Sequence, residues 1–382
     1  MAARRALRVT MHSTTVEACG VADYTRDLIA GLDGSVGVEV VPIEGAGASP
    51  LAALSMARRL SAADLTHIQH NYGFWGRGSL GYRVVLETLQ RAISVPIVLT
   101  AHSVRPPLPR QWDGTVKRAV IKALGLHEFM DRGTFRFAAR IIVHSRRHLQ
   151  RLVERGIPRA RLVELMPGVP DVTIPPGSAV ATLQSTWDLE GKRVLGLFGF
   201  IQPNKNYELA VRALAHLPED VVLLIAGGVR TAGEEWYGAK LRELIRSLGM
   251  ERRVRITGFL PAQARAVALG AVDLFVLPYA ADDSVSYSAR LCLAHAKPLL
   301  ASAVDAFAEL QERYRCVELF ATDDPAELAA QIGSLLADEA RRQGLVDGAR
   351  RYGRERSWRR VAAETIDVYG AAVGRTACES SS

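Results

Sequence analysis

Side chains able to hold a hydroxyl or move a proton follow two short apolar runs in the first half of the chain. Gln69 and His70 end one run, and His102 follows the next. A neutral imidazole both donates and accepts hydrogen bonds near pH 7. We therefore expect these three residues to contact a sugar-like ligand. The position of His67 within its run is more typical of a packed strand histidine.

Groups suited to an anion occur in the second half. Lys205 lies between the apolar run Val194–Phe198 and a helical stretch, where a lysine can reach a phosphate and neutralise a leaving group. An ordinary solvated loop lysine is the alternative. Ser286, Tyr287 and Ser288 begin another helical stretch, and N–H groups at a helix start can hold a diphosphate. The preceding acids Asp282–Asp283 could instead be helix caps.

A glycine in the first loop completes the candidate binding groups. Gly20 lies in the loop His12–Tyr24, where the backbone could approach an anion or a sugar hydroxyl at a helix start. The loop is not G-x-G-x-x-G, which disfavours a nicotinamide cofactor, and we expect no cofactor. A plain turn with Asp23 as the helix cap is the alternative.

These residues need strands and helices to position them. Short β-rich runs alternate with amphipathic stretches, which predicts mainly parallel sheets with helices on both faces. The expected strands are Leu7–Met11, Val38–Pro42, Leu65–Gln69, Pro96–Thr100, Arg140–His144, Leu162–Met166, Val194–Phe198, Val221–Ala226, Val254–Gly258, Leu274–Leu277, Pro298–Ser302 and Val317–Phe320. The expected helices are Tyr24–Leu32, Leu51–Leu60, Tyr82–Ala92, Arg146–Arg155, Tyr207–Leu214, Trp236–Leu248, Pro261–Leu269, Ser288–Ala296, Pro325–Leu336 and Ser357–Val373.

The chain of 382 residues is long enough for two α/β domains with separate cores. Gly and Pro make up half of Pro167–Pro176, which we interpret as the linker. We therefore expect a first domain over residues 1–170 and a second over 171–355. The segment 356–375 would be a helix packing back on the first domain, and 376–382 a disordered tail. Because doubly wound sheets bind ligands at the carboxyl ends of their strands, the site is expected in the cleft between the domains.

Composition narrows the partners and the compartment. The formal net charge is +8, which favours anionic partners, although mere solubility explains it equally well. No nucleic-acid motif accompanies the basic stretches, so we expect no nucleic-acid partner. The four cysteines have no metal or disulfide spacing, and no apolar stretch resembles a signal peptide or a membrane span. A cytoplasmic protein is expected. The basic stretch Arg105–Arg118 weakly favours peripheral contact with the inner face of a membrane.

Seven motifs together resemble the family 4 retaining glycosyltransferases, also called glycosyl transferases group 1, which have the GT-B fold. They are Cys19–Thr25, His67–Gly73, Leu99–Ser103, Val143–Ser145, Gly199–Lys205, Ile225–Gly228 and Ala296–Ser302. The resemblance extends from about Leu7 to about Tyr369. It implies an α/β fold of two facing Rossmann-like domains with a cleft and a C-terminal crossover helix. It further implies a nucleotide-diphosphate sugar donor held by the second domain, an acceptor at the first, and no essential metal.

The resemblance also suggests roles for individual residues. Gly20 would lie near the sugar or diphosphate, His102 near the donor sugar and Lys205 at the diphosphate, with the helix start at Ser286–Ser288 adding N–H groups. Of the acidic pair of the family, Asp283 corresponds to the first member and would contact a sugar.

Two departures from the family pattern concern donor binding. Phe200–Gln202 stands where members usually carry an arginine, and Leu291 replaces the second acid, which normally binds ribose hydroxyls. The nucleotide could then be a deoxy one, or its ribose could be held differently. A catalytically weak nucleotide-binding partner of another transferase is therefore the alternative to an active hexosyltransferase. The acceptor stays open among a glycolipid, a cyclitol and a secondary metabolite.

Overall fold

The computed structural model describes residues 6–16, 19–44, 49–75, 79–104, 132–280 and 286–374. The chain forms two compact units. In the described ranges, the first unit runs to Gly168 and resumes at Arg356, and the second runs from Val169 to Glu355. The expected disordered tail 376–382 and the basic stretch Arg105–Arg118 lie outside the described residues.

A parallel sheet forms the centre of the first unit. Its described strands follow the order β2-β1-β3-β4-β5-β6. Their bounds are β1 Leu7–Ser13, β2 Val36–Pro42, β3 Leu65–His70, β4 Ile97–Ala101, β5 Arg140–Val143 and β6 Leu162–Glu164. Strand order reverses direction between β1 and β3, and such a switch point is where doubly wound sheets leave a crevice for ligands at the carboxyl ends of the strands.

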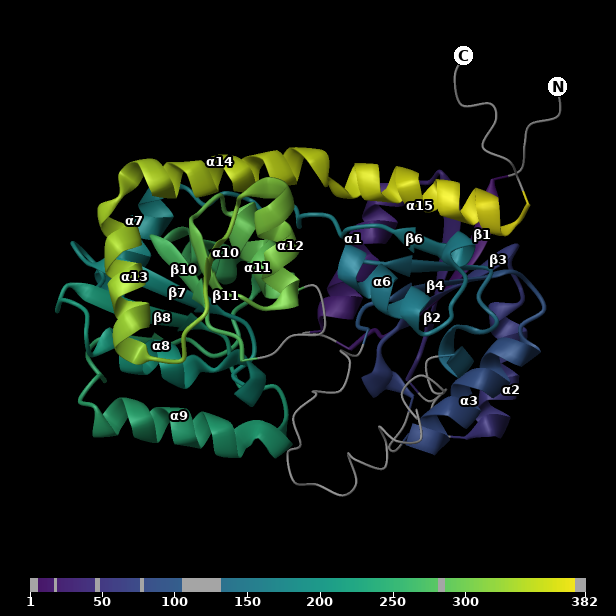
Figure 1. Cartoon of the computed structure of the whole chain (residues 1–382), viewed down its shortest axis with the longest axis horizontal. Helices are drawn as coiled ribbons and strands as arrows, with labels where there is room; N and C mark the ends of the chain where they lie inside the picture. The colour runs from purple at the N-terminus through teal and green to yellow at the C-terminus, as the bar shows by residue number, and fades with distance from the viewer. Residues whose placement is uncertain are drawn as a thin grey trace, which may run out of the picture. The chain divides into compact units, whose positions relative to one another are not determined.

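Helices cover the two faces of this sheet. They are α1 Gly20–Leu32, α2 Pro50–Leu60, α3 Ser79–Ala92, α6 Arg146–Glu154 and α15 Trp358–Ala372. Ser49, Ser145 and Ser357 each cap the helix that follows by accepting a hydrogen bond from an N–H group in its first turn. Helices α1 and α15 pack side by side on one apolar cluster (Figure 1), whereas α2, α3 and α6 pack on the other.

The second unit has its own parallel sheet, whose described strands follow the order β12-β11-β10-β7-β8-β9. Their bounds are β7 Arg193–Phe198, β8 Val221–Ala226, β9 Val254–Ile256, β10 Leu274–Leu277, β11 Leu299–Ser302 and β12 Glu318–Phe320. Numbered within the unit, this is the Rossmann order 3-2-1-4-5-6. The switch point lies between β7 and β10, so a ligand crevice is expected after these two strands.

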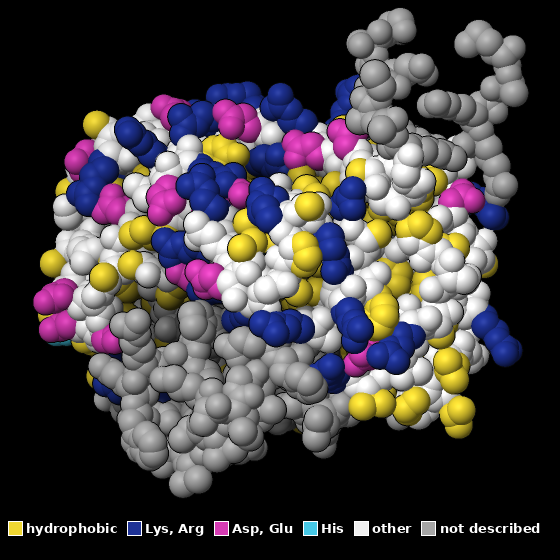
Figure 2. Space-filling view, turned by 45° about the vertical axis from the view of Figure 1, so that its right-hand side comes forward, with side chains coloured by type: hydrophobic (Ala, Val, Ile, Leu, Met, Phe, Trp, Pro, Cys, Tyr) yellow, Lys and Arg dark blue, Asp and Glu magenta, His cyan; other side chains and the backbone are white. Residues whose placement is uncertain are grey.

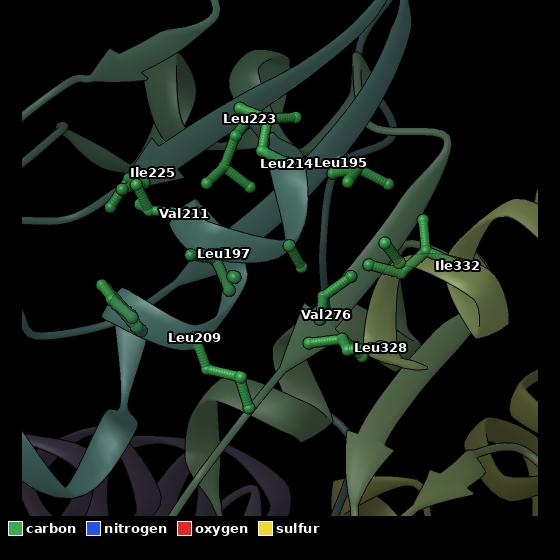
Figure 3. Packing of buried hydrophobic residues seen from close by; sticks show 14 of the residues in the cluster. Leu195, Leu197, Leu209, Val211, Leu214, Leu223, Ile225, Val276, Leu328 and Ile332 are labelled. Atoms are coloured by element: carbon green, nitrogen blue, oxygen red, sulfur yellow. The ribbon is translucent and has the colours of Figure 1, made fainter. Parts of the chain in front are cut away.

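The second sheet is also covered on both faces. Its helices are α7 Gly177–Thr186, α8 Tyr207–Leu214, α9 Glu235–Ser247, α10 Ala262–Gly270, α11 Tyr287–Ala294, α12 Asp305–Tyr314, α13 Pro325–Ala337 and α14 Glu339–Glu355. Leucine, isoleucine and valine side chains from β7, β8, β10, α8 and α13 interdigitate in one core (Figure 3). Outside this core, helix α10 packs against α7, and helix α14 packs against α11 and α12.

The fold class predicted from the sequence is confirmed: the chain is α/β with two doubly wound parallel sheets, and the last helix crosses back to pack on α1. In the described residues, the sequence prediction missed three helices. Helix α7 buries none of its residues, so it has no apolar stripe to reveal it. Helix α14 is rich in charged residues, and α12 is a short segment between two strands.

On the face of the molecule drawn in Figure 2, Lys and Arg side chains lie among Asp, Glu and apolar side chains. In the described ranges, every helix is too short or too polar to cross a membrane.

Candidate functional site

Lys205 lies at the switch point of the second unit. It ends the short 3₁₀ turn Pro203–Lys205 that follows β7, and only 9% of its surface is exposed. Its Nζ lies 3.5 Å from the ring centroid of Tyr279, which follows β10. The N–H of Ala280 donates to the carbonyl of Asn204 at 3.0 Å, which ties the two loops together. Lys205 is therefore a held, buried cation and not the solvated loop lysine of the alternative interpretation.

The start of α11 joins Lys205 through Tyr279. The hydroxyls of Tyr279 and Ser286 lie 3.2 Å apart, and Ser286 Oγ accepts a hydrogen bond from the N–H of Ala289 at 3.2 Å. Tyr287 and Ser288 lie in the first turn of α11. The N–H groups of a first turn point out of the N-terminal end of the helix, which is the positive end of its dipole. The structure thus links Lys205 to Ser286 through Tyr279, and Tyr287 and Ser288 follow in the same helix start; that these residues bind a diphosphate stays a prediction.

Two glycines let the backbone pass closely beside this helix start. A Cβ on Gly199 would stand 2.7 Å from Ser288 Oγ, and its φ of +125° also favours glycine. A Cβ on Gly227 would stand 1.9 Å from the carbonyl oxygen of Gly199. The ends of β7 and β8 and the start of α11 therefore pack so closely at the switch point that no side chain would fit at Gly199 or Gly227.

An aromatic pair with a cation lies at the same edge of the sheet. The rings of Phe200 and Phe259 meet edge to face with centroids 5.9 Å apart, and Phe259 is 56% exposed. The guanidinium of Arg230, from the loop after β8, lies 5.2 Å from the centroid of Phe200. Sequence reasoning noted the missing arginine near Phe200 but missed Arg230, which brings a guanidinium to this place from the neighbouring strand.

Asp283 and Leu291 were both discussed for donor binding, and the structure describes only Leu291. Asp283, with its neighbour Asp282, lies outside the described residues. Leu291 is on α11 and is 3% exposed, so it packs as a core residue.

In the first unit, a buried polar line crosses the carboxyl ends of four adjacent strands. Gln69 Oε1 lies 2.8 Å from Nε2 of His102, and Nδ1 of His102 lies 3.3 Å from Nε2 of His144. Nδ1 of His144 lies 3.0 Å from the carbonyl oxygen of Leu165. Ala101 pairs with Val143 and Val143 with Glu164, so His102, His144 and Leu165 are register neighbours just beyond β4, β5 and β6.

A second branch leads from Gln69 to the C-terminal helix. The amide nitrogen of Gln69 lies 3.3 Å from Nε2 of His67. The two ring nitrogens of His67 lie 2.7 Å from the hydroxyls of Thr100 and of Tyr369 on α15. Burial lowers the pKa of His67 to about 3, so this ring is neutral at pH 7. His67 is a packed strand histidine, as its position in the sequence indicated.

Aromatic rings support the two histidines from the same face. The ring of Tyr24, on α1, contacts His102 edge-on with centroids 4.7 Å apart and contacts His144 at 5.1 Å. Trp358, the first residue of α15, packs on Tyr24 at 5.0 Å. His102 is 8% exposed and His144 1%, so His102 is the more accessible member of the pair.

His70 does not join this group. Its Nδ1 accepts a hydrogen bond from Nε1 of Trp75 at 3.0 Å, and its ring packs edge-on against Phe135. Adjacent residues of a strand point to opposite faces of a sheet, so Gln69 and His70 diverge. Sequence reasoning placed both with His102, but only Gln69 lies there.

Gly20 is the first residue of α1 and lies at the switch point of the first unit. The interpretation of Asp23 as helix cap was wrong, because α1 begins earlier and Cys19 holds the cap position; Asp23 pairs instead with Arg26 at 2.8 Å.

Glu44 accepts hydrogen bonds from Thr14 and Thr15. Burial acts to raise the pKa of Glu44, but these hydrogen bonds outweigh it and the pKa is lowered. Glu44 thus holds the loop that leads to Gly20.

His144 was the main residue missed. The motif Val143–Ser145 was noticed, but His144 was not named as a functional residue. The signal was available, because His144 ends a predicted strand, just as His70 and His102 lie just beyond the ends of two others. In the described part of the chain, no three His, Cys, Asp or Glu side chains converge as metal ligands.

Comparison with known proteins identifies the class of enzyme. Residues 192–338 match the family described as glycosyl transferases group 1. A D-inositol 3-phosphate glycosyltransferase of Salinispora tropica is 27% identical over 368 residues, covering 92% of this chain and 73% of the relative. One of Xylanimonas cellulosilytica is 31% identical over 244 residues, covering 62% of this chain and 57% of the relative.

Solved structures share the fold. Anabaena HepE in complex with UDP and glucose has a TM-score of 0.76 at 17% identity, covering 96% of this chain and all of that one. Sucrose-phosphate synthase of Thermosynechococcus elongatus has a TM-score of 0.75 at 18% identity, covering 97% of this chain and all of that one. Together with the family match and the named relatives, these findings indicate a transferase enzyme, a glycosyltransferase with the GT-B fold.

Proposed function

We propose that this protein transfers a hexose-type sugar from a nucleotide-diphosphate donor, with retention of anomeric configuration and without a metal. The observation that carries the proposal is the buried cation Lys205, held on Tyr279 beside the start of α11 at the switch point of the second sheet. That HepE structures contain UDP, UDP with glucose or UDP-glucose supports a nucleotide-sugar donor.

The second unit would hold the donor diphosphate. Lys205 supplies a full positive charge, and the first-turn N–H groups of Tyr287 and Ser288 supply dipoles toward the same place. Both act more strongly on a diphosphate that has lost the sugar, because negative charge then increases on it. Stabilisation that grows toward the transition state accelerates the reaction.

The first unit would hold the sugar. His102 and Gln69 place polar side chains at the carboxyl ends of β3 and β4, and Gly20 opens the backbone at the start of α1. In the proposed mechanism the leaving phosphate oxygen takes the proton of the acceptor hydroxyl, which requires attack from the face that the diphosphate leaves. Retention follows from this geometry. His70 is left out of the proposed sugar site, and Asp283 stays in it as a candidate for mutagenesis.

The names of the relatives guide the choice of acceptor. Since several are D-inositol 3-phosphate glycosyltransferases, we place a phosphorylated cyclitol first among the acceptors and keep a glycolipid or a secondary metabolite behind it. A cytoplasmic location is part of the same proposal, and membrane contact would be needed only for a lipid acceptor.

The experiment is transfer from UDP-glucose and UDP-N-acetylglucosamine to D-inositol 3-phosphate, with proton NMR of the first product formed. The expected product has the α configuration of the donor. Unphosphorylated inositol is the matched control for the role of the phosphate. A β-configured product would overturn the retaining mechanism, and equal transfer to inositol would overturn the phosphorylated acceptor.

A further inference from the structure

The contacts of His102 and His144 constrain where their protons can lie. The carbonyl of Leu165 can only accept, so Nδ1 of His144 carries a proton. A hydrogen bond between the two rings needs one proton on either His102 Nδ1 or His144 Nε2. The third contact, from Nε2 of His102 to the carbonyl oxygen of Gln69, needs another.

These three hydrogen bonds need three ring protons, whereas two neutral imidazoles supply two. We propose that His102 and His144 act as one group that holds a single added proton, and that His144 is a positioning residue for His102. When the proton leaves, the amide of Gln69 turns so that its NH₂ donates to the bare Nε2 of His102. The pair then has one ring proton on each Nδ1, and these three contacts are again satisfied.

The pair accepts one added proton and resists a second. If both rings were charged, two like charges would stand 3.3 Å apart with an N–H facing an N–H. The titratable groups of the first unit that contact or adjoin the pair include Tyr24 from α1, His67 from β3 and, behind His67, Tyr369 from α15. Arg356 binds the carbonyl of Met166, next to Leu165, and pairs with Glu364 at 2.9 Å.

The pair therefore gives the proposed sugar site a defined charge. His144 keeps Nδ1 of His102 occupied, so any change of proton occurs at Nε2, the edge shared with Gln69. This functional reading rests on the proposed role of His102 at the donor sugar, but the proton count does not.

The test is nitrogen NMR of the full chain labelled with ¹⁵N-histidine, since ring nitrogens with and without a proton differ in chemical shift. The variants His144→Phe and His144→Gln identify the ring-nitrogen signals of His144, because those signals are lost in both. Phenylalanine keeps the ring shape and offers no acceptor, whereas the glutamine oxygen can still accept from Nδ1 of His102. We expect a proton on Nδ1 of both rings at high pH in the wild type, and one shared protonation step as the pH falls.

The two variants should differ in the pH at which His102 is protonated. His144→Phe should lower the midpoint of His102 protonation by about one pH unit or more, the scale of one hydrogen bond to a charged group, and His144→Gln should restore it. Two separate protonation steps, or His102 neutral with a bare Nδ1, would overturn the pair. If the NMR pattern appears but no sugar is transferred by the wild type, the pair stands and the proposed function falls.

Discussion

The backbone of Gly31 on α1 lies directly against Trp358, the first residue of α15. A Cβ on Gly31 would stand 2.6 Å from the carbonyl oxygen of Trp358 and 3.1 Å from Cβ of Ala362. This close approach lets Trp358 reach Tyr24, which in turn packs on His102. The last helix of the chain thus supports the polar line of the first unit.

Gly31→Ala should therefore destabilise the first unit by about 1–3 kcal/mol, because the added methyl meets backbone that cannot move aside. Gly344→Ala is the matched control: Gly344 is exposed within α14 with nothing near its Cβ, so alanine should stabilise that helix by up to about 1 kcal/mol. Hydrogen exchange measured peptide by peptide reads the two units separately. Unchanged protection of α1 and α15 in Gly31→Ala would contradict the close contact.

Acid should weaken the fold through buried neutral histidines. Burial lowers the pKa of His12 to about 4, of His67 to about 3 and of His295 to about 4. The unfolded chain binds these protons near pH 6.5, so the stability they give is complete above that pH and is lost as the pH falls toward 4. Each histidine contributes about 1.4 kcal/mol per pH unit in that window.

His12→Asn tests this linkage, because the asparagine amide can still donate to the carbonyl of Val41, the partner of Nδ1 of His12. Urea unfolding between pH 6 and pH 4.5 should show a slope of stability against pH that is smaller by about 1.4 kcal/mol per unit than in the wild type. An unchanged slope would mean that His12 does not stay neutral in the folded protein.

Arg230 should take part in donor binding. If its guanidinium replaces the missing charge near Phe200, Arg230→Met should raise KM for the nucleotide sugar about tenfold, the scale of one lost charge-assisted contact. Arg252→Met, at an exposed arginine before β9, is the control and should leave KM near the wild-type value. If the two substitutions changed KM equally, Arg230 would act only through the general positive charge of the surface and would have no specific role in donor binding.

Turnover should survive excess EDTA. Lys205 and the start of α11 supply the positive charge that a metal would otherwise bring to a diphosphate. Steady-state rates with and without chelator check this. Complete loss of activity, restored by magnesium or manganese, would contradict it and direct attention to Asp282–Asp283.

The sequence predicted the central strands well because a strand buried on both faces is a short apolar run, so Val221–Ala226 and Leu274–Leu277 were placed without error. The side of a sheet to which a strand-end residue points was harder. Gln69 and His70 are neighbours in sequence and diverge in space, which only the register of β3 decides. His144 and Arg230 come together with their partners through strand order, which local patterns do not reveal.

Release of nucleoside diphosphate tests the central claim most directly. The wild type, Lys205→Met and the control Lys192→Met, at an exposed lysine before β7, would be incubated with a panel of UDP-, GDP- and ADP-sugars and acceptor. Methionine is chosen because it is unbranched, apolar and of similar length, and Lys205 is buried with its Nζ over the ring of Tyr279. The account predicts release from at least one donor by the wild type and by Lys192→Met, and a loss of about 10²–10³-fold in kcat for Lys205→Met with the fold retained. Release at the wild-type rate by Lys205→Met, or no release from any donor by the wild type, would contradict it.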